Sequence, residues 1–327
     1  MNWKSKSVLV TGAGGFIGSH LAEALVRAGA KTRALVHYNS AGRHGWLDQS
    51  DLADEMEIVA GDIQQPDSVK NALQGVDVVF HLAALIAIPY SYVSPSSYVS
   101  ANIVGTLNIL QEAMRSNVSR VVHTSTSEVY GTARWVPITE DHPLQGQSPY
   151  SATKIGADKL AESFHRAFGL PVSIVRPFNT YGPRQSARAV IPTIMTQALA
   201  GDPVHIGNTT PTRDFNYVAD TVRGFMLNAA SDSAIGRVIN LGTGTEISIG
   251  ELAKTICAIV GSNCEIVQDD QRVRPSASEV DRLLADNHLA TELLGWRPEV
   301  SLHEGLQRTL EWVRDNLDRY RTGVYAL

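Results

Sequence analysis

The sequence predicts an α/β protein with a doubly wound parallel sheet, and three observations support this fold class. Short apolar runs alternate with longer stretches of helical periodicity through the first half of the chain, which is typical of parallel strands joined by crossover helices. The runs are apolar at almost every position, as in strands that helices cover on both faces. A glycine-rich turn joins the first run to the first helical stretch, as expected at a tight strand-to-helix connection.

Six strands and two long helices are expected in this first part. The strands are predicted from short apolar runs, and the helices from apolar and small residues at intervals of three and four. Six strand–helix steps fit a Rossmann-like sheet. The expected strands are residues 7–11, 32–36, 57–60, 77–82, 120–124 and 172–176, and the expected helices are residues 17–28 and 148–168.

The rhythm of the sequence changes after Pro177, where loops lengthen and the strand–helix alternation becomes irregular. Two later helical patterns, at residues 249–260 and 301–316, indicate a smaller α/β lobe. No low-complexity linker separates the two parts. We therefore expect residues 1–176 to form a Rossmann domain and residues 177–327 to form mainly a substrate-binding lobe, with some segments returning to the first domain.

The composition argues against several classes of partner. Lysine and arginine number 28 against 33 acidic residues, a net charge of -5, so no nucleic acid or membrane partner is expected. No apolar run approaches the roughly 20 residues of a membrane span, and the first residues lack a signal-peptide pattern, which predicts a cytoplasmic protein. Cys257 and Cys264 are interpreted as ordinary thiols of a reducing compartment, and no metal site is predicted.

The turn after the first strand is a G-x-x-G-x-x-G sequence made by Gly12, Gly15 and Gly18. The first glycine permits the tight turn, the second lets the backbone approach a pyrophosphate, and the third allows close packing of helix on sheet. The start of the following helix, with Phe16 and Ile17, supplies free N–H groups and partial positive charge. In this context the signature predicts an NAD(P)-binding site.

Two more strand ends are expected to contact the same cofactor. Asp62 and Ile63 follow the third strand and are placed at the adenine edge. Leu82, Ala83 and Ala84 follow the fourth strand and are expected to run along the cofactor. The reason is that the carboxyl ends of parallel strands line the ligand crevice of such sheets.

The end of the second strand leaves the choice between NAD and NADP open. An NAD site usually places an acidic residue there for the ribose hydroxyls. This chain has His37 instead, with Arg43 close by. NADP is therefore not repelled, and either residue is a candidate for binding its 2′-phosphate.

Tyr150 and Lys154 are candidates for the catalytic pair. They stand four residues apart and therefore lie on one face of the helix expected at residues 148–168. A free tyrosine has a pKa near 10, and a fixed cation a few ångströms away favours the phenolate. We predict that Tyr150 acts as a base, and that Lys154 lowers its pKa and also holds the nicotinamide ribose.

Polar residues follow the fifth strand, where the ligand crevice is expected. The hydroxyls of Ser125, Thr126 and Ser127 are candidates for binding a substrate hydroxyl and sharing its proton. Simple alcohol oxidation needs no further carboxylate, so Glu128 is a candidate for a second proton transfer, such as abstraction next to a newly formed ketone. The alternative for Glu128 is an ion pair with an arginine or a turn cap.

Three arginines of the second part are candidates for binding an anionic substrate. They are Arg184, Arg213 and Arg274, all in expected loops. Planar guanidinium groups suit diphosphates. Each one alone fits a structural ion pair equally well, but three in loops predicted to face one cleft favour a diphosphate site.

These motifs resemble the extended short-chain dehydrogenases/reductases that act on nucleotide sugars. The resemblance runs through nearly the whole chain. Within that superfamily the sequence is most similar to the 4,6-dehydratases of legionaminic acid biosynthesis, a likeness that includes residues 36–40 and 88–93. The motifs that carry the resemblance are the glycine signature, Ser-Thr-Ser-Glu-Val-Tyr-Gly (125–131), Tyr-x-x-x-Lys (150–154), Arg-Pro-Phe-Asn-Thr-Tyr-Gly-Pro-Arg (176–184), Arg-Asp-Phe-Asn-Tyr-Val (213–218) and Leu-Gly-Trp-Arg-Pro (294–298).

The resemblance implies a lyase that removes water from a nucleotide diphosphate hexose, with NDP-N-acetylglucosamine as the expected substrate and NAD as the favoured cofactor. Tyr150, assisted by Lys154 and Thr126, is implied to take the proton of the C4 hydroxyl while hydride passes to the nicotinamide. Glu128 is implied to remove the C5 proton before water leaves from C6. Hydride then returns to C6, which yields a 4-keto-6-deoxy sugar.

The resemblance also implies binding roles. Asn179 and Arg213 are implied to hold the diphosphate, with Arg274 nearby, and Asn102 to lie near the active-site helix. Relatives of this type often form homodimers through helices that include the one expected at residues 148–168.

Three alternatives remain open. Ser127-Glu128 stands where dTDP-glucose dehydratases have Asp-Glu, whereas GDP-mannose dehydratases and UDP-glucuronate decarboxylases have Ser-Glu. UDP-glucuronate decarboxylation and C4 epimerisation are therefore alternative reactions. A non-catalytic NAD(P) sensor is a more distant one, because such sensors typically lack the pair formed here by Tyr150 and Lys154.

Overall fold

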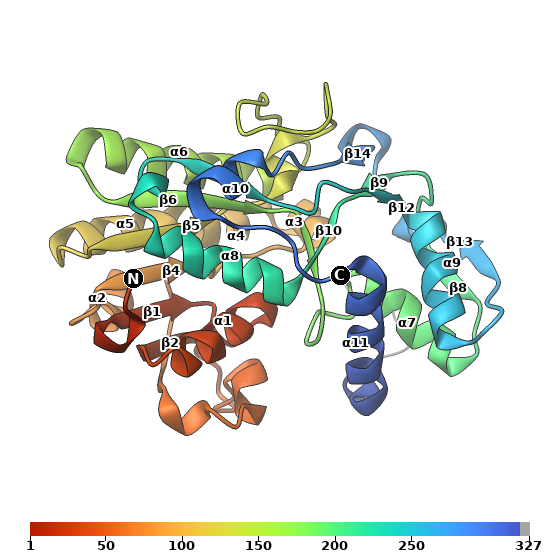
Figure 1. The fold of residues 1–327 in the computed structure, drawn as a ribbon, viewed down its shortest axis with the longest axis horizontal. Coiled ribbons are helices and arrows are strands. Elements are labelled where there is room, and N and C mark those ends of the chain that lie inside the picture. Colours follow the sequence, from red (N-terminus) through yellow and green to blue (C-terminus); the bar gives the residue numbers. More distant parts are fainter. Residues whose placement is uncertain (321–327) are drawn as a thin grey trace.

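One sheet of seven parallel strands forms the frame of the molecule, for which a computed structural model describes residues 1–320 (Figure 1). Six of the strands were predicted, and the seventh comes from the part of the chain after Pro177. The strands are β1 (Ser7–Thr11), β2 (Lys31–His37), β3 (Glu57–Gly61), β4 (Val78–His81), β5 (Arg120–Thr124), β6 (Val172–Pro177) and β11 (Val238–Leu241). They lie in the order β11-β6-β5-β4-β1-β2-β3, which confirms the predicted doubly wound sheet.

The strand order reverses next to β1. From β1 the chain builds outward through β2 and β3, and then returns to place β4 on the other side of β1. In open sheets of this kind, ligands bind at the carboxyl ends of the strands where the order reverses. The turns after β1 and β4 therefore border the expected cofactor site.

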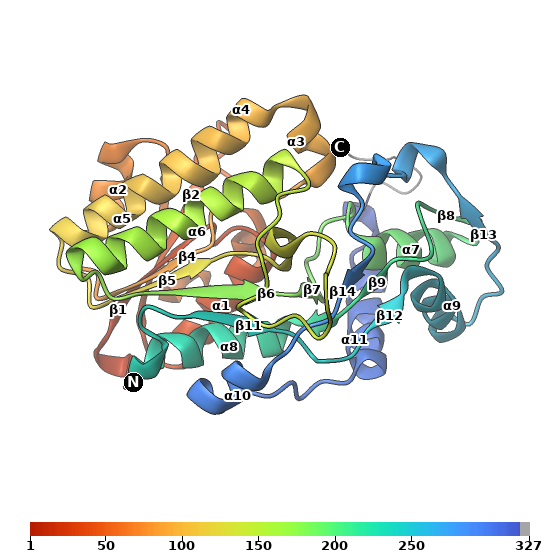
Figure 2. The same ribbon diagram turned by 90° about the horizontal axis from the view of Figure 1, so that it is seen from above.

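Helices cover both faces of the sheet (Figure 2). Side chains of a strand alternate between its two faces, and in β1 Val8 and Val10 join one buried cluster while Leu9 joins the other. This double burial explains why the strands are apolar at consecutive positions. One face carries α1 (Phe16–Arg27) and α8 (Val218–Ala230), and the other carries α2 (Pro66–Ala72), α5 (Gly105–Arg115) and α6 (Pro149–Phe168).

Helix α6 has strong signals at both ends. Ser148 caps its start by accepting a hydrogen bond from the backbone N–H of Ser151 at 3.1 Å, and Pro149 occupies the first turn. Gly169 ends the helix in the left-handed conformation, with φ of 69°, which glycine adopts without strain. The capping residues therefore set both ends of α6, and its start lies directly before the predicted catalytic pair.

The second lobe consists of short strands in small sheets and of helices that pack on them. The predicted helix at residues 249–260 is confirmed with the same bounds, and the one at 301–316 is shorter by one residue at each end. Its elements are β7 (Asn179–Tyr181), α7 (Val190–Ala200), β8 (Val204–Ile206), β9 (Thr212–Arg213), β10 (Phe215–Tyr217), β12 (Ile247–Ser248), α9 (Ile249–Val260), β13 (Ile266–Gln268), β14 (Arg282–Leu283) and α11 (Leu302–Asp315).

Part of the chain after Pro177 packs with the large sheet. Strand β11 pairs with β6, α8 packs against α1, and α10 (His288–Leu294) contacts both α8 and β11. Strand β11 extends the sheet, and the helices α8 and α10 cover it on the side of α1. Figure 1 shows both helices in front of the sheet.

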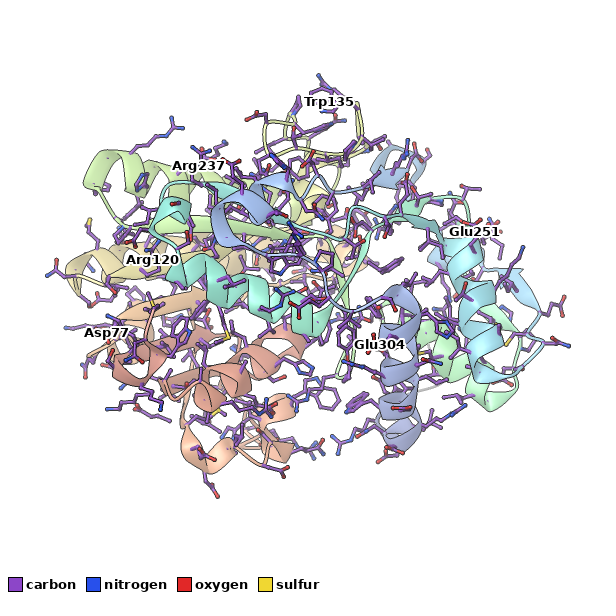
Figure 3. All side chains as sticks on the ribbon, viewed as in Figure 1. Asp77, Arg120, Trp135, Arg237, Glu251 and Glu304 are labelled. Atoms are coloured by element: carbon purple, nitrogen blue, oxygen red, sulfur yellow. The ribbon has the colours of Figure 1, made fainter. Side chains whose placement is uncertain are left out.

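Short helices complete the described chain. They are α3 (Ile88–Val93), α4 (Pro95–Tyr98), the π-helical turn η4 (Val99–Val104), and the 3₁₀ turns η1 (Trp3–Ser5), η2 (Gly45–Gln49), η3 (Ala53–Glu55), η5 (Ser127–Tyr130), η6 (Asp232–Ala234), η7 (Asp270–Arg272), η8 (Ser276–Ser278) and η9 (Leu317–Arg319). Within residues 1–320, no helix is both long and apolar enough to cross a membrane. The loop between η5 and α6 carries Trp135 at the outer edge of the molecule (Figure 3).

Candidate active site

The glycine-rich turn leaves an open space in front of helix α1. Gly12 has φ of 71°, and a Cβ there would lie 2.9 Å from Cα of Ala83, so the turn needs glycine. At Gly15, a Cβ would meet only the carbonyl oxygen of Gly12, at 3.2 Å, and otherwise points into unfilled space. Gly15 caps α1 without a side-chain hydrogen bond, and Phe16 and Ile17 form its first turn. Free N–H groups beside an open space fit a pyrophosphate.

Hydrogen bonds to Thr11 connect the end of β4 to the end of β1, and sequence analysis missed this residue. The Oγ1 of Thr11 accepts hydrogen bonds from the backbone N–H groups of Leu82 at 3.1 Å and Ala83 at 3.0 Å. It also contacts Nδ1 of His81 at 2.9 Å. Residues 82–84 are thereby held beside Gly12, as the cofactor prediction requires. The only sequence signal was a threonine at the end of an apolar strand.

The residues after β3 border the same end of the sheet. The carboxylate of Asp62 accepts a hydrogen bond from the backbone N–H of Gln64 at 2.9 Å. Ile63 is buried, and its carbonyl accepts from the side-chain amide of Asn108 at 2.9 Å. The Ile63 side chain packs against Gly105 in α5, so this residue presents backbone rather than side chain to the site.

The loop after β2 is closed by Asn39. Its side-chain amide donates to the carbonyl of Arg43 at 2.6 Å and accepts from the Arg43 N–H at 3.1 Å. His37 ends β2, and both His37 and Arg43 are exposed. The next part of the loop is fixed to the glycine turn, because the N–H of Trp46 donates to the carbonyl of Gly14 at 3.0 Å.

Tyr150 and Lys154 lie on the buried face of α6, as predicted. Their exposed fractions are 7% and 4%. The side chain of Thr126 lies close enough to the Tyr150 hydroxyl to lower its pKa, and Nζ of Lys154 donates to the carbonyl of Thr124 at 2.6 Å. Thr126 also accepts from the N–H of Glu128 at 3.2 Å. The end of β5 and the start of α6 therefore bring the predicted catalytic residues together.

The electrostatics of the pair differ from the prediction. Burial raises the pKa of Tyr150 above its ordinary value, the hydrogen bond from Thr126 lowers it, and the charge of Glu128 raises it. Burial also lowers the pKa of Lys154 to about 8. Desolvation is the largest of these effects, and the polypeptide by itself holds Tyr150 neutral. A phenolate favoured jointly by Lys154 and the positive charge of the nicotinamide stays a prediction.

Ser125 does not belong to the substrate side of the site. It is 4% exposed, and its hydroxyl donates to Oδ2 of Asp158 at 2.7 Å. The predicted contact of Ser125 with substrate is therefore corrected, because this hydroxyl is already engaged inside the protein. Ser127 is also buried, at the start of η5, whereas Glu128 keeps 13% of its side chain exposed.

Arg213 and Arg274 converge on the acidic residues of the site. Nη1 of Arg274 lies 3.8 Å from Oε2 of Glu128 and 4.0 Å from Oε1 of Glu279. Nη2 of Arg213 lies 3.4 Å from the same Glu279 oxygen. Nη1 of Arg274 is buried and has no hydrogen-bond partner among residues 1–320. Two guanidinium groups thus lie close to Glu128, one of them with bonding capacity unused.

Arg184 lies apart from this group. Its guanidinium pairs with Oε1 of Glu23 in α1 at 2.8 Å and donates to the hydroxyl of Ser19 at 3.1 Å. The predicted role in substrate binding is corrected, since the side chain joins the loop after β7 to α1. Arg184 instead forms the structural ion pair that sequence analysis gave as the alternative.

Two asparagines that the resemblance singled out are both buried or partly buried near the ends of the strands. Oδ1 of Asn179, at the start of β7, is buried and has no hydrogen-bond partner in the described part of the chain. The side chain of Asn102 accepts from the N–H of Leu85 at 2.8 Å and donates to Oγ1 of Thr153 at 3.1 Å. Asn102 therefore ties the turn after β4 to the active-site helix α6.

A segment of the second lobe, residues 274–279 (the strap), contacts the first domain next to these residues. The hydroxyls of Tyr92 in α3 and Ser278 in η8 are 2.5 Å apart, and Ser278 donates to the carbonyl of Gln147 at 2.6 Å. The strap carries Arg274 and Glu279. Sequence analysis missed it because its contacts join segments that are 131 to 186 residues apart.

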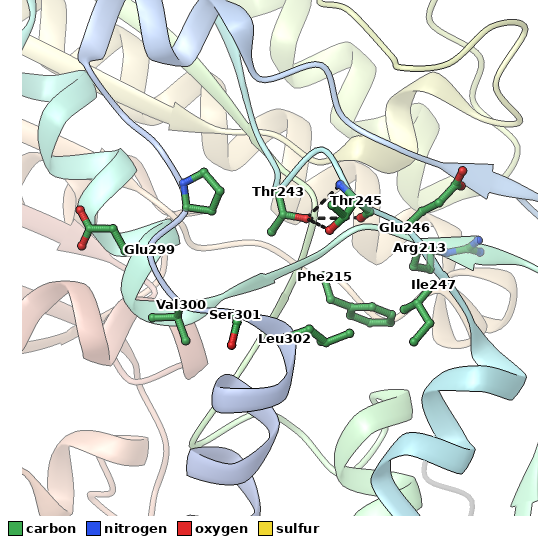
Figure 4. Close-up of a pocket in the computed structure, with 11 residues that line it drawn as sticks. Arg213, Phe215, Thr243, Thr245, Glu246, Ile247, Glu299, Val300, Ser301 and Leu302 are labelled. Carbon is green, nitrogen blue, oxygen red and sulfur yellow. Dashed lines mark hydrogen bonds between the residues drawn. The ribbon is translucent and has the colours of Figure 1, made fainter.

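A separate pocket lies in the second lobe (Figure 4). Phe215, Ile247 and Leu302 form its apolar part, between β10, β12 and the start of α11. Arg213 contributes to its edge, with the guanidinium turned away. Neither Tyr150 nor any other predicted catalytic residue lines this pocket.

Comparisons with known proteins agree with this site. A family model described as GDP-mannose 4,6 dehydratase matches residues 9–309. The UDP-glucose 4-epimerase of Mycolicibacterium smegmatis is 36% identical over 318 residues, covering 94% of this chain and 98% of that protein. The dTDP-glucose 4,6-dehydratase of Streptomyces antibioticus is 34% identical over 315 residues, covering 95% and 93%.

The solved structures give the same result. The dTDP-glucose 4,6-dehydratase of Streptomyces venezuelae, determined with NAD bound, superposes with a TM-score of 0.87 at 33% identity, and the match covers 96% of this chain and 99% of that one. Both the family model and these relatives extend over nearly the whole length. The chain therefore belongs to the GDP-mannose 4,6-dehydratase family, among the extended short-chain dehydrogenases/reductases.

Proposed function

We propose that this protein is an NAD-dependent nucleotide-sugar 4,6-dehydratase. The open space before α1 and the turn at residues 82–84 would hold NAD, with Asp62 and Ile63 at the adenine end and Lys154 at the nicotinamide ribose. When bound, NAD would supply the hydride acceptor for oxidation at the sugar C4 and the hydride donor for reduction at C6. NAD is bound in the related dehydratase from Streptomyces venezuelae, which supports this choice of cofactor.

Glu128 is the observation that carries the choice of a dehydratase. Oxidation at C4 needs only a proton acceptor, and Tyr150 with Thr126 and Lys154 provides it. Glu128 adds a carboxylate close enough to Tyr150 for its charge to raise the pKa of the phenol. A second acid–base group next to the first suits a second proton transfer from the same sugar.

The sequence of proton transfers follows from these positions. Tyr150, ionised once the positive charge of a bound nicotinamide adds to that of Lys154, would take the proton of the C4 hydroxyl as C4 becomes a ketone. The ketone acidifies the hydrogen on C5, and Glu128 removes it as a proton. The C6 hydroxyl leaves as water with a proton from the protein, a double bond forms between C5 and C6, and C5 is reprotonated when C6 receives the hydride. The net change is loss of one water from the sugar.

The substrate is proposed to be a nucleotide diphosphate N-acetylhexosamine, of the gluco type. Arg274 lies 3.8 Å from Glu128, and Arg213 pairs with the neighbouring Glu279. Guanidinium groups bind diphosphates in two-point contacts. Asn179 adds a buried amide oxygen with unused bonding capacity. The N-acetyl group and the place in legionaminic acid biosynthesis rest on the sequence resemblance alone.

C4 epimerisation is the second candidate. The M. smegmatis relative is a UDP-glucose 4-epimerase, and Tyr150, Lys154 and Thr126 would serve that reaction without Glu128. UDP-glucuronate decarboxylation shares the oxidation step as well.

A homodimer is proposed through the helices on the α5–α6 face. Val99 and Val104, in and at the end of η4, are 46% and 41% exposed, and Phe168 at the end of α6 is 60% exposed. Elements η4, α5 and α6 contact one another. Exposed apolar side chains on neighbouring helices are typical of a contact surface.

Mass spectrometry of products tests the proposal. The purified protein is incubated with NAD and UDP- or GDP-linked N-acetylglucosamine, glucose or glucuronate. Loss of one water supports dehydration, loss of carbon dioxide supports decarboxylation, and unchanged mass with a new sugar supports epimerisation. Glu128→Gln is expected to stop water loss while reduced nicotinamide still forms. Full dehydration by Glu128→Gln would contradict the role of Glu128.

A further inference from the structure

A fully buried carboxylate, that of Asp158, lies one helical turn after Lys154 in α6. Its exposed fraction is 0%, and that of Lys154 is 4%. Residues four positions apart lie on the same helix face. The reaction proposed above gives Asp158 no role, although burying a charge is costly unless other charges and hydrogen bonds compensate it.

The compensating groups come from two neighbouring strands. Oδ2 of Asp158 accepts from the hydroxyl of Ser125 at 2.7 Å and from Nη2 of Arg176 at 2.9 Å. Oδ1 lies 3.3 Å from Nε2 of His123. These partners belong to β5, the residue directly after it, and β6. One carboxylate thus fastens helix α6 to the ends of two central strands.

The contact between Asp158 and Ser125 affects the predicted catalytic residues because they are neighbours of Ser125 along the chain. Ser125 directly precedes Thr126, whose side chain lies close enough to the Tyr150 hydroxyl to lower its pKa. On the other side of Ser125, the carbonyl of Thr124 accepts from Lys154 at 2.6 Å. Helix α6 therefore holds this segment at two successive residues, and the position of Thr126 depends on both contacts.

The charge of the same carboxylate also acts on Lys154, which stands one helical turn before it in α6. Burial lowers the pKa of Lys154 to about 8, and the charge of Asp158 opposes this effect. The groups that face Lys154 from β4 and β5 are His81 and His123, and burial lowers the pKa of both, so they are neutral.

The remaining charged groups near Lys154 have other partners. Arg176 on β6 is paired with Asp158. Tyr150, on the same helix, is held neutral by burial. Glu128 in η5 lies toward Arg274. Asp158 is therefore the carboxylate on which the charge of Lys154 depends.

We propose that Asp158 is a positioning residue for the C4 oxidation: its carboxylate keeps Lys154 positively charged and, through Ser125, holds Thr126 against Tyr150. The consequence for turnover rests on the proposed function, whereas the consequence for the charge of Lys154 does not. The two parts are therefore tested separately.

The charge of Lys154 is measured without any substrate. The full-length protein is acylated with limiting acetic anhydride across a range of pH, and the labelling of Lys154 is followed by mass spectrometry. Asp158→Asn removes the charge and keeps the shape, so the pH of half-maximal labelling should fall by about one unit or more. An unchanged pH of half-maximal labelling would overturn the proposal.

Asp220→Asn is the matched control. Asp220 is 2% exposed, pairs with Arg223 at 2.8 Å and accepts from the N–H groups of Glu299 and Val300 at 3.0 Å each, but it lies in α8. We expect it to cost stability and to leave Lys154 labelling as in the wild type. The same shift in both variants would show a general effect of loosening the fold and would also overturn the proposal.

Two variants that keep a carboxylate test the positioning part. Asp158→Glu retains the charge and moves the oxygen atoms, and Ser125→Ala removes only the hydrogen bond. Both should label at Lys154 like the wild type and should lower kcat by about tenfold with little change in KM. They also keep the proposal testable if Asp158→Asn does not fold.

Turnover measurements distinguish a failure of the proposed function from a failure of the positioning role of Asp158. In Asp158→Asn the alkaline limb of kcat/KM should move to lower pH, because Lys154 loses its proton earlier. A wild type that converts no nucleotide sugar refutes the proposed function and leaves the labelling result standing. An active wild type with undiminished kcat in Ser125→Ala and Asp158→Glu refutes the positioning role.

Discussion

The guanidinium of Arg274 and the carboxylate of Glu128 approach to 3.8 Å, beyond the length of a good hydrogen bond. The buried Nη1 of Arg274 has no hydrogen-bond partner among residues 1–320. A loosely held cation next to the proposed base has bonding capacity left for an anionic group of a substrate. This relationship leads to the first prediction.

Arg274→Ala should raise KM for the nucleotide sugar by about tenfold to a hundredfold, since loss of a charged hydrogen bond costs roughly 1.4–2.8 kcal/mol. Steady-state kinetics measure the effect. Arg184→Ala is the control, because its partner is Glu23 in α1. The control should lower the melting temperature and leave KM unchanged, and equal KM values for the two variants would contradict the assignment.

Gly15→Ala should weaken NAD binding by about tenfold, equivalent to roughly 1.4 kcal/mol, with little loss of stability. The backbone of Gly15, at φ -82°, suits any residue, and the new Cβ points into the space proposed for the pyrophosphate. Gly12→Ala should instead destabilise the fold by roughly 1–2 kcal/mol, because φ is 71° and Ala83 is in the way. Calorimetric titration with NAD and thermal melts separate the two effects.

Thr11→Val should cost about 1–3 kcal/mol of unfolding free energy, because the N–H groups of Leu82 and Ala83 lose their acceptor. Urea denaturation measures the loss, and NAD binding should weaken with it. Thr11→Ser retains the hydroxyl and should stay close to the wild type. If Thr11→Ser is as unstable as Thr11→Val, the hydrogen bonds accepted by the Thr11 hydroxyl do not explain the effect.

Acid should reveal the contribution of Asp158 to stability. Its contacts with His123 and Arg176 lower the pKa from the ordinary 3.8 to about 2. A carboxyl with a lowered pKa stabilises the fold fully above pH 3.8, and this contribution is lost as the pH falls toward 2. The loss should be roughly 2 kcal/mol. Urea denaturation from pH 5 downward should show a steeper fall for the wild type than for Asp158→Asn; equal slopes would contradict the assignment.

Much of the fold was predictable because its signals are local. Continuous apolar runs marked six of the seven strands of the large sheet. The ends of α6 are marked by the residues that cap it, Ser148 with Pro149 at its start and Gly169 at its end. Strand β11 escaped prediction because it lies among the irregular loops after Pro177. Its place next to β6 depends on contacts with a strand more than 60 residues earlier.

The candidate site divides in the same way. Tyr150 and Lys154 were found because their spacing places them on one helix face, and Gly12 because the turn cannot accommodate a side chain. Ser125 and Arg184 were assigned to substrate wrongly, since a polar residue in a loop gives no sign of the buried partner that occupies it. Asp158 and Glu23 are those partners, and each lies on another element.

By itself the sequence determined the six strands of the first part of the chain, the glycine turn and the Tyr–Lys pair, because these depend on residues within one or two helical turns of each other. Only the tertiary structure decided which hydroxyls and guanidinium groups are free for a ligand. The same packing made Tyr150 neutral against the simple electrostatic expectation. The physical reason is desolvation: the pKa of a group and its free hydrogen-bonding capacity depend on what surrounds it in space, and that is assembled from distant parts of the chain.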